Sequence, residues 1–143
     1  MPRLEIIAAA LVLLLAQPTL AQTDKVDVSL ASECTTDPVS ASGKGHTCYA
    51  DNPTCQTAPA NYVISEKTIQ PRATSWNGAL VDNTAGSCVV TFKDYVELIE
   101  GSEIYQPKTV CLRAVAESGS GMGKAGIRGW SKCVVTGKVS KYR

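Results

Sequence analysis

The chain has 143 residues, six cysteines and one histidine, and its formal net charge at pH 7 is +1. This length predicts one domain, or two at most. Apolar residues make up 44% of the chain, which excludes a fully disordered protein, because disordered chains are poor in apolar residues and strongly charged. A net charge so close to zero gives no long-range steering toward nucleic acid, so we expect no nucleic-acid partner.

Residues 1–21 have the layout of a secretory signal peptide. Arg3 provides a short positive start, residues 6–16 are an unbroken apolar run, and small residues precede a cleavage site between Ala21 and Gln22. The apolar run is about half of the ~20 residues that a membrane-spanning helix needs, so we expect no membrane span. Export to the periplasm or the medium would leave a single domain of residues 22–143.

The first part of that domain contains one clear strand and one irregular region. Residues 25–31 alternate between polar and apolar side chains, which predicts a half-buried strand. Residues 32–60 show no helical or strand period and are rich in turn-forming residues. We therefore expect a loop-rich lobe that is held together by its three cysteines.

From residue 61 onward the pattern is that of strands separated by turns. Residues 61–70 are strand-like and end at Pro71, and residues 72–82 resemble a short hairpin with a turn at Asn77 and Gly78. Residues 88–99 form the longest expected strand, with a bulge or bend where the alternation is lost at Asp94.

Two further strands, at residues 104–117 and 127–139, flank a glycine-rich segment and are expected to form a hairpin. Six to eight such strands predict an all-β fold, an antiparallel β-sandwich that is immunoglobulin-like in layout. Trp76 and Trp130 do not reproduce the Cys–Trp–Cys spacing of antibody domains, so the likeness concerns architecture alone.

An even number of cysteines in an exported chain predicts three disulfides. Cys111 and Cys133 lie symmetrically about Met122, so a hairpin closed there would place them opposite each other and favours a Cys111–Cys133 bridge. No CxxC pair and no zinc-ligand spacing is present, so we expect no metal, no cofactor and no redox-active dithiol. The partners of the other four cysteines stay open, namely Cys34, Cys48, Cys55 and Cys88.

No motif indicates a catalytic centre. His46 is the single histidine and lies in a glycine-rich loop, where a solvated side chain is the usual role. Residues 121–126 match GxGxxG by letter, but a strand is expected to follow instead of a helix, which indicates a turn and not a nucleotide site.

The glycine-rich turn and the basic C-terminal residues are the candidate binding surface. The last twenty residues contain no acid, so their cations could contact an anionic partner, although lysines on an edge strand also protect a sheet from aggregation. The candidate binding residues are Met122, Lys124, Arg128, Trp130, Lys132 and Lys138.

The sequence therefore favours a secreted or periplasmic, non-enzymatic module for binding or structural interaction at the cell surface, with a protein or glycan partner. One alternative is a small secreted hydrolase, because four acids crowd one short segment and paired carboxylates can perform acid–base chemistry. These acids are Asp94, Glu97, Glu100 and Glu103. Another alternative is a secreted inhibitor or effector that its disulfides protect against proteolysis.

Overall fold

A computed structural model describes residues 27–77, 80–81 and 86–142 of the chain. The predicted signal peptide at residues 1–21 lies outside the described residues. In chain order the elements are β1 (Val28–Thr35), β2 (Thr47–Tyr49), β3 (Thr54–Thr57), β4 (Tyr62–Ile64), the 3-10 turn η1 (Glu66–Thr68), β5 (Gln70–Asn77), β6 (Leu80–Val81), β7 (Gly86–Glu97), β8 (Tyr105–Glu117), the 3-10 turn η2 (Met122–Lys124), β9 (Gly129–Gly137) and β10 (Val139–Lys141).

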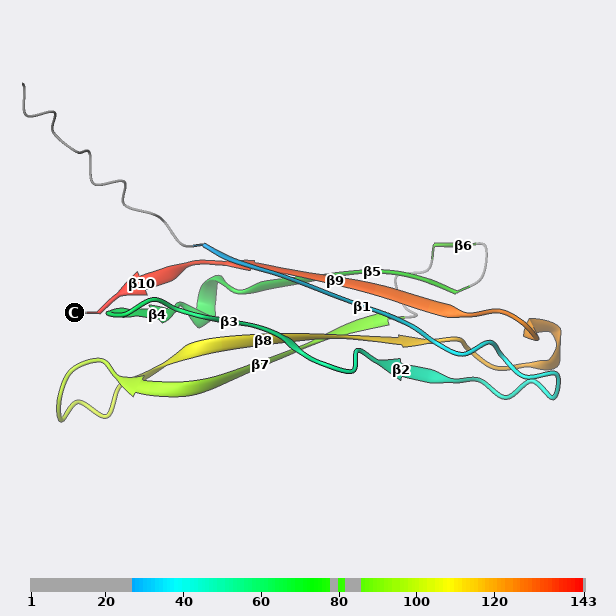
Figure 1. The fold of residues 1–143 in the computed structure, drawn as a ribbon, viewed down its shortest axis with the longest axis horizontal. Helices are drawn as coiled ribbons and strands as arrows, with labels where there is room; N and C mark the ends of the chain where they lie inside the picture. Colours follow the sequence, from blue (N-terminus) through cyan, green and yellow to red (C-terminus); the bar gives the residue numbers. More distant parts are fainter. Residues whose placement is uncertain (1–26, 78–79, 82–85, 143) are drawn as a thin grey trace, which may run out of the picture.

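The strands form two antiparallel layers, which run along the long axis of the molecule (Figure 1). One layer has the order β1-β9-β5-β6. In the other layer β8 is central, with β7 along one edge and with β2 and β3 along the other. Strands β10 and β4 form a small separate pair. The predicted all-β antiparallel sandwich is confirmed, and its likeness to the immunoglobulin fold stays a prediction.

The core lies between the inner faces of β8, β9 and β1. Alternation along each strand directs every second side chain into this space. Val110, Leu112 and Ala114 of β8 and Val135 of β9 have no exposed surface. Burial of each Val or Leu side chain contributes about 1.5–3 kcal/mol, so these central strands hold the two layers together. Among the described residues, no helix is long and apolar enough to cross a membrane.

Several strand predictions are confirmed, and others need correction. Strands β7 and β8 match their expected segments to within two residues, whereas β1 continues to Thr35, beyond the expected end at residue 31. Strand β5 pairs with β6 as the expected hairpin, although Gly78 lies outside the described residues. The lobe at 32–60 is less irregular than expected, because β2 and β3 both pair with β8. Residues 61–70 are not one strand: they contain β4, η1 and the first residue of β5.

The expected hairpin of β8 and β9 is wrong. Each is the central strand of a different layer, and residues 118–128 between them cross from one layer to the other. The loop is long enough to bridge the ~10 Å that separates stacked sheets. Backbone bonds tie this crossover to residues 36–46, since Gly121 N donates to Gly43 O (2.9 Å) and Gly126 N donates to Val39 O (2.9 Å).

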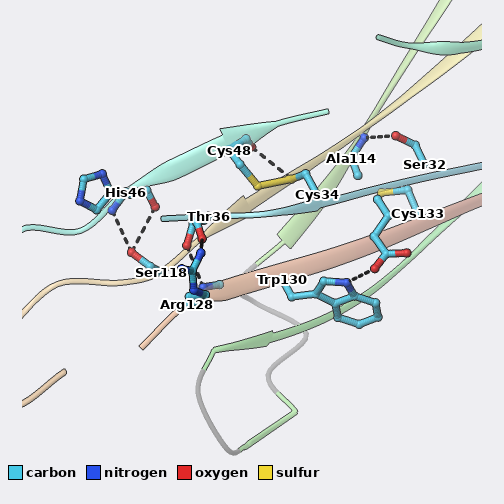
Figure 2. The surroundings of a disulfide bond; sticks show 12 residues. Ser32, Cys34, Thr36, His46, Cys48, Ala114, Ser118, Arg128, Trp130 and Cys133 are labelled. Atoms are coloured by element: carbon cyan, nitrogen blue, oxygen red, sulfur yellow. Dashed lines mark hydrogen bonds between the residues drawn. A yellow bond between two sulfur atoms is a disulfide. The ribbon is translucent and has the colours of Figure 1, made fainter. Parts of the chain in front are cut away.

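The expected Cys111–Cys133 disulfide is wrong for the same reason. Cys133 is fully buried on the inner face of β9 and is bonded to Cys88 of β7 in the opposite layer, with 5.6 Å between the Cα atoms. Cys111 lies on the outer face of β8, where the neighbouring strand β3 places Cys55 directly opposite. The third bridge joins Cys34 of β1 to Cys48 of β2 and again connects the layers (Figure 2).

This connectivity is open to direct measurement. Digestion of the oxidised protein without reductant should release three linked peptide pairs, containing Cys34–Cys48, Cys55–Cys111 and Cys88–Cys133. Mass spectrometry before and after reduction identifies them, and alkylation of the unreduced protein should label no cysteine. A peptide pair that joins Cys111 to Cys133 would contradict the two-layer arrangement.

A second prediction concerns two buried serines. Ser131 is fully buried at a place where the two layers approach closely, because a Cβ built on Gly86 would lie 2.7 Å from Ser131 Cβ. The Ser131 hydroxyl has no hydrogen-bond partner among the described residues. Ser118 is equally buried, but its hydroxyl accepts a hydrogen bond from His46 N (2.8 Å). In urea unfolding, Ser131→Ala should leave the free energy of unfolding unchanged or raise it by up to about 1 kcal/mol, whereas Ser118→Ala should lower it by about 1–3 kcal/mol. Equal destabilisation by both variants would show that Ser131 has a partner.

Candidate functional site

The outer surface of the layer formed by β1, β9 and β5 is a flat array of exposed side chains. The pairing register places these side chains in four rows across the three strands. We call this surface the β1–β9–β5 face. From one end to the other its rows are Thr35, Trp130 and Trp76; Glu33, Lys132 and Thr74; Ala31, Val134 and Arg72; and Ser29, Thr136 and Gln70.

Two indole rings occupy the first row. Trp130 and Trp76 are directly opposite each other on β9 and β5, with ring centroids 5.9 Å apart and ring planes tilted by 55°. Trp76 is 48% exposed although it is a large apolar side chain. The indole Nε1–H of Trp130 donates a hydrogen bond to the Glu33 carboxylate, which fixes the orientation of the ring (Figure 2). The pair is therefore an oriented aromatic surface open to solvent.

Polar and charged groups dominate the other three rows. Glu33 lies opposite Lys132, so the second row contains charges of both signs. Arg72 lies in the third row beside Val134, which is 37% exposed, and no acid shares that row. Hydroxyl and amide groups make up the fourth row. Among the four rows, the net charge is therefore positive only in the third, at Arg72.

Beyond the fourth row, the face ends in a recess of about 610 Å³. Its base is formed by the start of β1 and the end of β9, and η1 forms one side. The side chain of Gln56 on β3 orders the start of β1, because its Oε1 accepts from Ser29 N (3.0 Å) and its Nε2 donates to Asp27 O (3.2 Å). The recess is lined by Asp27, Val28, Ser29, Lys67, Thr68, Gln70, Thr136, Gly137 and Lys138.

The structure separates the six predicted binding residues into two groups. Trp130 and Lys132 lie on the β1–β9–β5 face and Lys138 lies in its terminal recess. The other three belong to the crossover between β8 and β9, at the opposite end of the long axis (Figure 1). There Met122 is 76% exposed, and Arg128 Nη1 donates to Thr36 O (3.1 Å).

Sequence reasoning missed the contribution of β5 and η1. Trp76 was not among the expected binding residues, but it shares the outward parity of Arg72 and Thr74 along β5, and this alternation was the available signal. Lys67 could not be found in this way, because η1 interrupts the segment that was expected to be a single strand.

The acids of the expected hydrolase centre are partly committed to the fold. Asp94 has a φ of 58° and its Oδ2 accepts from the buried Thr109 hydroxyl (2.7 Å). Glu97 Oε1 accepts from Glu103 N (3.0 Å) across the β7–β8 turn. Two further recesses, of about 360 and 230 Å³, contain none of the four acids.

His46 does not form a catalytic pair with the neighbouring serine. The Ser118 hydroxyl contacts only the main-chain N and O of His46 (2.8 and 3.3 Å), and the imidazole is not part of these bonds (Figure 2). Within the described residues, no three His, Cys, Asp or Glu side chains are grouped so that they could hold a metal ion.

The geometry thus identifies the β1–β9–β5 face and its terminal recess as the best-developed candidate site. The chain matches no protein-family model, no curated protein and no solved structure.

Proposed function

We propose that this protein is a non-enzymatic binding module that works outside the cytoplasm and holds a polysaccharide chain against the β1–β9–β5 face. The observation that carries this proposal is the contact between the exposed Trp76 and the half-buried Trp130 at one end of a largely polar sheet surface. Indole faces are apolar and broad, and the C–H faces of sugar rings pack against such surfaces, while the indole N–H is left for a polar partner.

The composition of the face favours a polyhydroxylated ligand over a folded protein. The centre of a protein–protein interface is depleted in charged residues and rich in apolar contacts. Here Glu33, Lys132 and Arg72 lie in the middle rows beside Thr74, Ala31 and Val134, and the largest apolar side chains of the face are the two indoles. Such a surface suits an extended chain that needs many hydrogen bonds along its length.

A location outside the cytoplasm is supported by two independent features. Three disulfides indicate an oxidising compartment, because cytosolic thiols are kept reduced. The first 21 residues have the pattern of a cleaved export signal. A polysaccharide of the cell surface or of the surroundings would be accessible to an exported module.

The hydrolase alternative has weaker support. Its acids stabilise the β7–β8 hairpin through Asp94 and Glu97, and none of the described recesses contains two of them. Glycoside hydrolysis needs two carboxyl groups on either side of one bond, one of which acts as an acid. The inhibitor or effector alternative differs in its partner and would use a different surface.

The proposal is tested with a panel of neutral and acidic polysaccharides, measured by affinity electrophoresis and calorimetry. Trp76→Ala should weaken binding about tenfold, because stacking on an aromatic ring contributes about 0.5–1.5 kcal/mol beyond its area. Tyr49→Ala is the matched control, since Tyr49 is a 60% exposed aromatic residue of β2 in the other layer and should not affect binding.

Circular dichroism and thermal unfolding establish that both variants are folded. The proposal fails if no polysaccharide binds, or if Trp76→Ala and Tyr49→Ala bind as tightly as the unchanged protein. Release of reducing sugar ends from a bound chain would instead support the hydrolase alternative.

A further inference from the structure

The recess at the end of the β1–β9–β5 face has the chemistry of an anion site. Lys67 of η1 and Lys138, which follows β9, are exposed residues that line it, and among the described lining residues Asp27 is the single acid. Hydroxyl groups of Ser29 and Thr136 border the same space. Ammonium groups act as point charges toward carboxylate, sulfate or phosphate oxygens, and hydroxyl groups can donate hydrogen bonds to them.

The two lysines are held in place by their backbones. The Thr68 hydroxyl accepts a hydrogen bond from Lys138 N (2.8 Å) and donates one to Ser65 O (2.7 Å). The Thr68 side chain therefore joins η1, which contains Lys67, to Lys138, the residue that follows β9. Gly137 allows the close approach, because a Cβ at that position would collide with the Ile69 side chain. The positions from which both side chains project are thus set by the fold.

Charge along the face gives the bound chain a direction. Glu33 lies beside Lys132 near the indoles. Arg72 and then the two recess lysines lie farther along, and Asp27 is the acid among the described residues that line the recess. Trp130 and Thr136 are six residues apart on β9, which corresponds to about 20 Å of extended strand. A ligand must span about this length to contact the indoles and the recess together.

We propose that this recess is an anion subsite, and that the ligand of the face is an acidic polysaccharide whose carboxylate or sulfate groups bind Lys67 and Lys138. This inference rests on the proposed function and deepens it by naming the class of polysaccharide. The indoles hold sugar rings at one end, and the lysines select charged sugars at the other.

The experiment compares three probes of long chain length: neutral dextran, polygalacturonate with carboxylates, and dextran sulfate with sulfate esters. At least one of the two anionic probes should bind about five times more tightly than dextran at low salt. This advantage should decrease as ionic strength rises. Lys67→Ala combined with Lys138→Ala should remove the advantage, so that the anionic probes bind this variant no more tightly than dextran does. The probe that depends on the lysines identifies the acid group.

The matched control is Lys44→Ala combined with Lys124→Ala, which removes two exposed lysines at the opposite end of the molecule and should preserve the preference for anionic chains. A galacturonate disaccharide should bind weakly and without dependence on Trp76, because it cannot span the face. Polygalacturonate binding should depend on both the lysines and Trp76.

The possible failures are distinguishable. If dextran binding depends on Trp76 but the Lys67/Lys138 double variant keeps the anionic preference, the recess inference is wrong and the proposed function stands. If the anionic probes bind through the two lysines and Trp76→Ala has no effect, the recess is an anion site and polysaccharide binding by the face is wrong. Equal loss in both double-lysine variants would indicate non-specific charge attraction and would overturn the inference.

Discussion

The packing of β8 against β9 and β1 is the constraint on which the rest of the structure depends. β8 lies at the centre of one layer and β9 at the centre of the other, and their inner side chains are fully buried between the layers. The Cys88–Cys133 bridge joins the layers at this level. Because the inner faces are used for packing, every second side chain of β9 and of its neighbours β1 and β5 is directed to solvent. The flatness and regular rows of the β1–β9–β5 face follow from this requirement of the core.

The same requirement explains how much could be predicted from the sequence. The segments of β1, β7 and β8 were predictable because alternation is a local property of the chain. The partner of each strand is not local: the glycine-rich residues 118–128 suit a hairpin and a crossover equally, and only the full set of strands decides between them. The wrong disulfide followed from the wrong partner. Trp130 and Lys132 were expected to bind because they lie in the basic C-terminal segment, but Trp76 and Arg72 join them only because β5 pairs with β9.

The candidate site illustrates how a small sandwich can bind a ligand without a deep cavity. The indoles, the mixed charges and the terminal recess come from β1, β5, β9 and η1. Only η1 and β5 are consecutive along the chain. Hydrogen bonds from Trp130 to Glu33 and from Lys138 N to Thr68 fix groups at both ends of the face. A surface that is ordered before the ligand arrives loses less conformational entropy on binding. Under the proposed function, rigidity of the sheet would supply part of the affinity that a pocket otherwise provides.

The order of the cysteines along the chain has a consequence for biogenesis. Cys55 and Cys111 bracket Cys88, and Cys88 and Cys133 bracket Cys111, so two of the bridges are interleaved. An oxidant that joined cysteines in the order in which they occur along the chain would make Cys34–Cys48 correctly, and then the non-native pairs Cys55–Cys88 and Cys111–Cys133. Maturation therefore needs either oxidation after the layers have collapsed or a disulfide isomerase that reshuffles the later bridges. Oxidation before collapse, in a compartment without such an isomerase, would leave scrambled molecules, whatever the stability of the native protein.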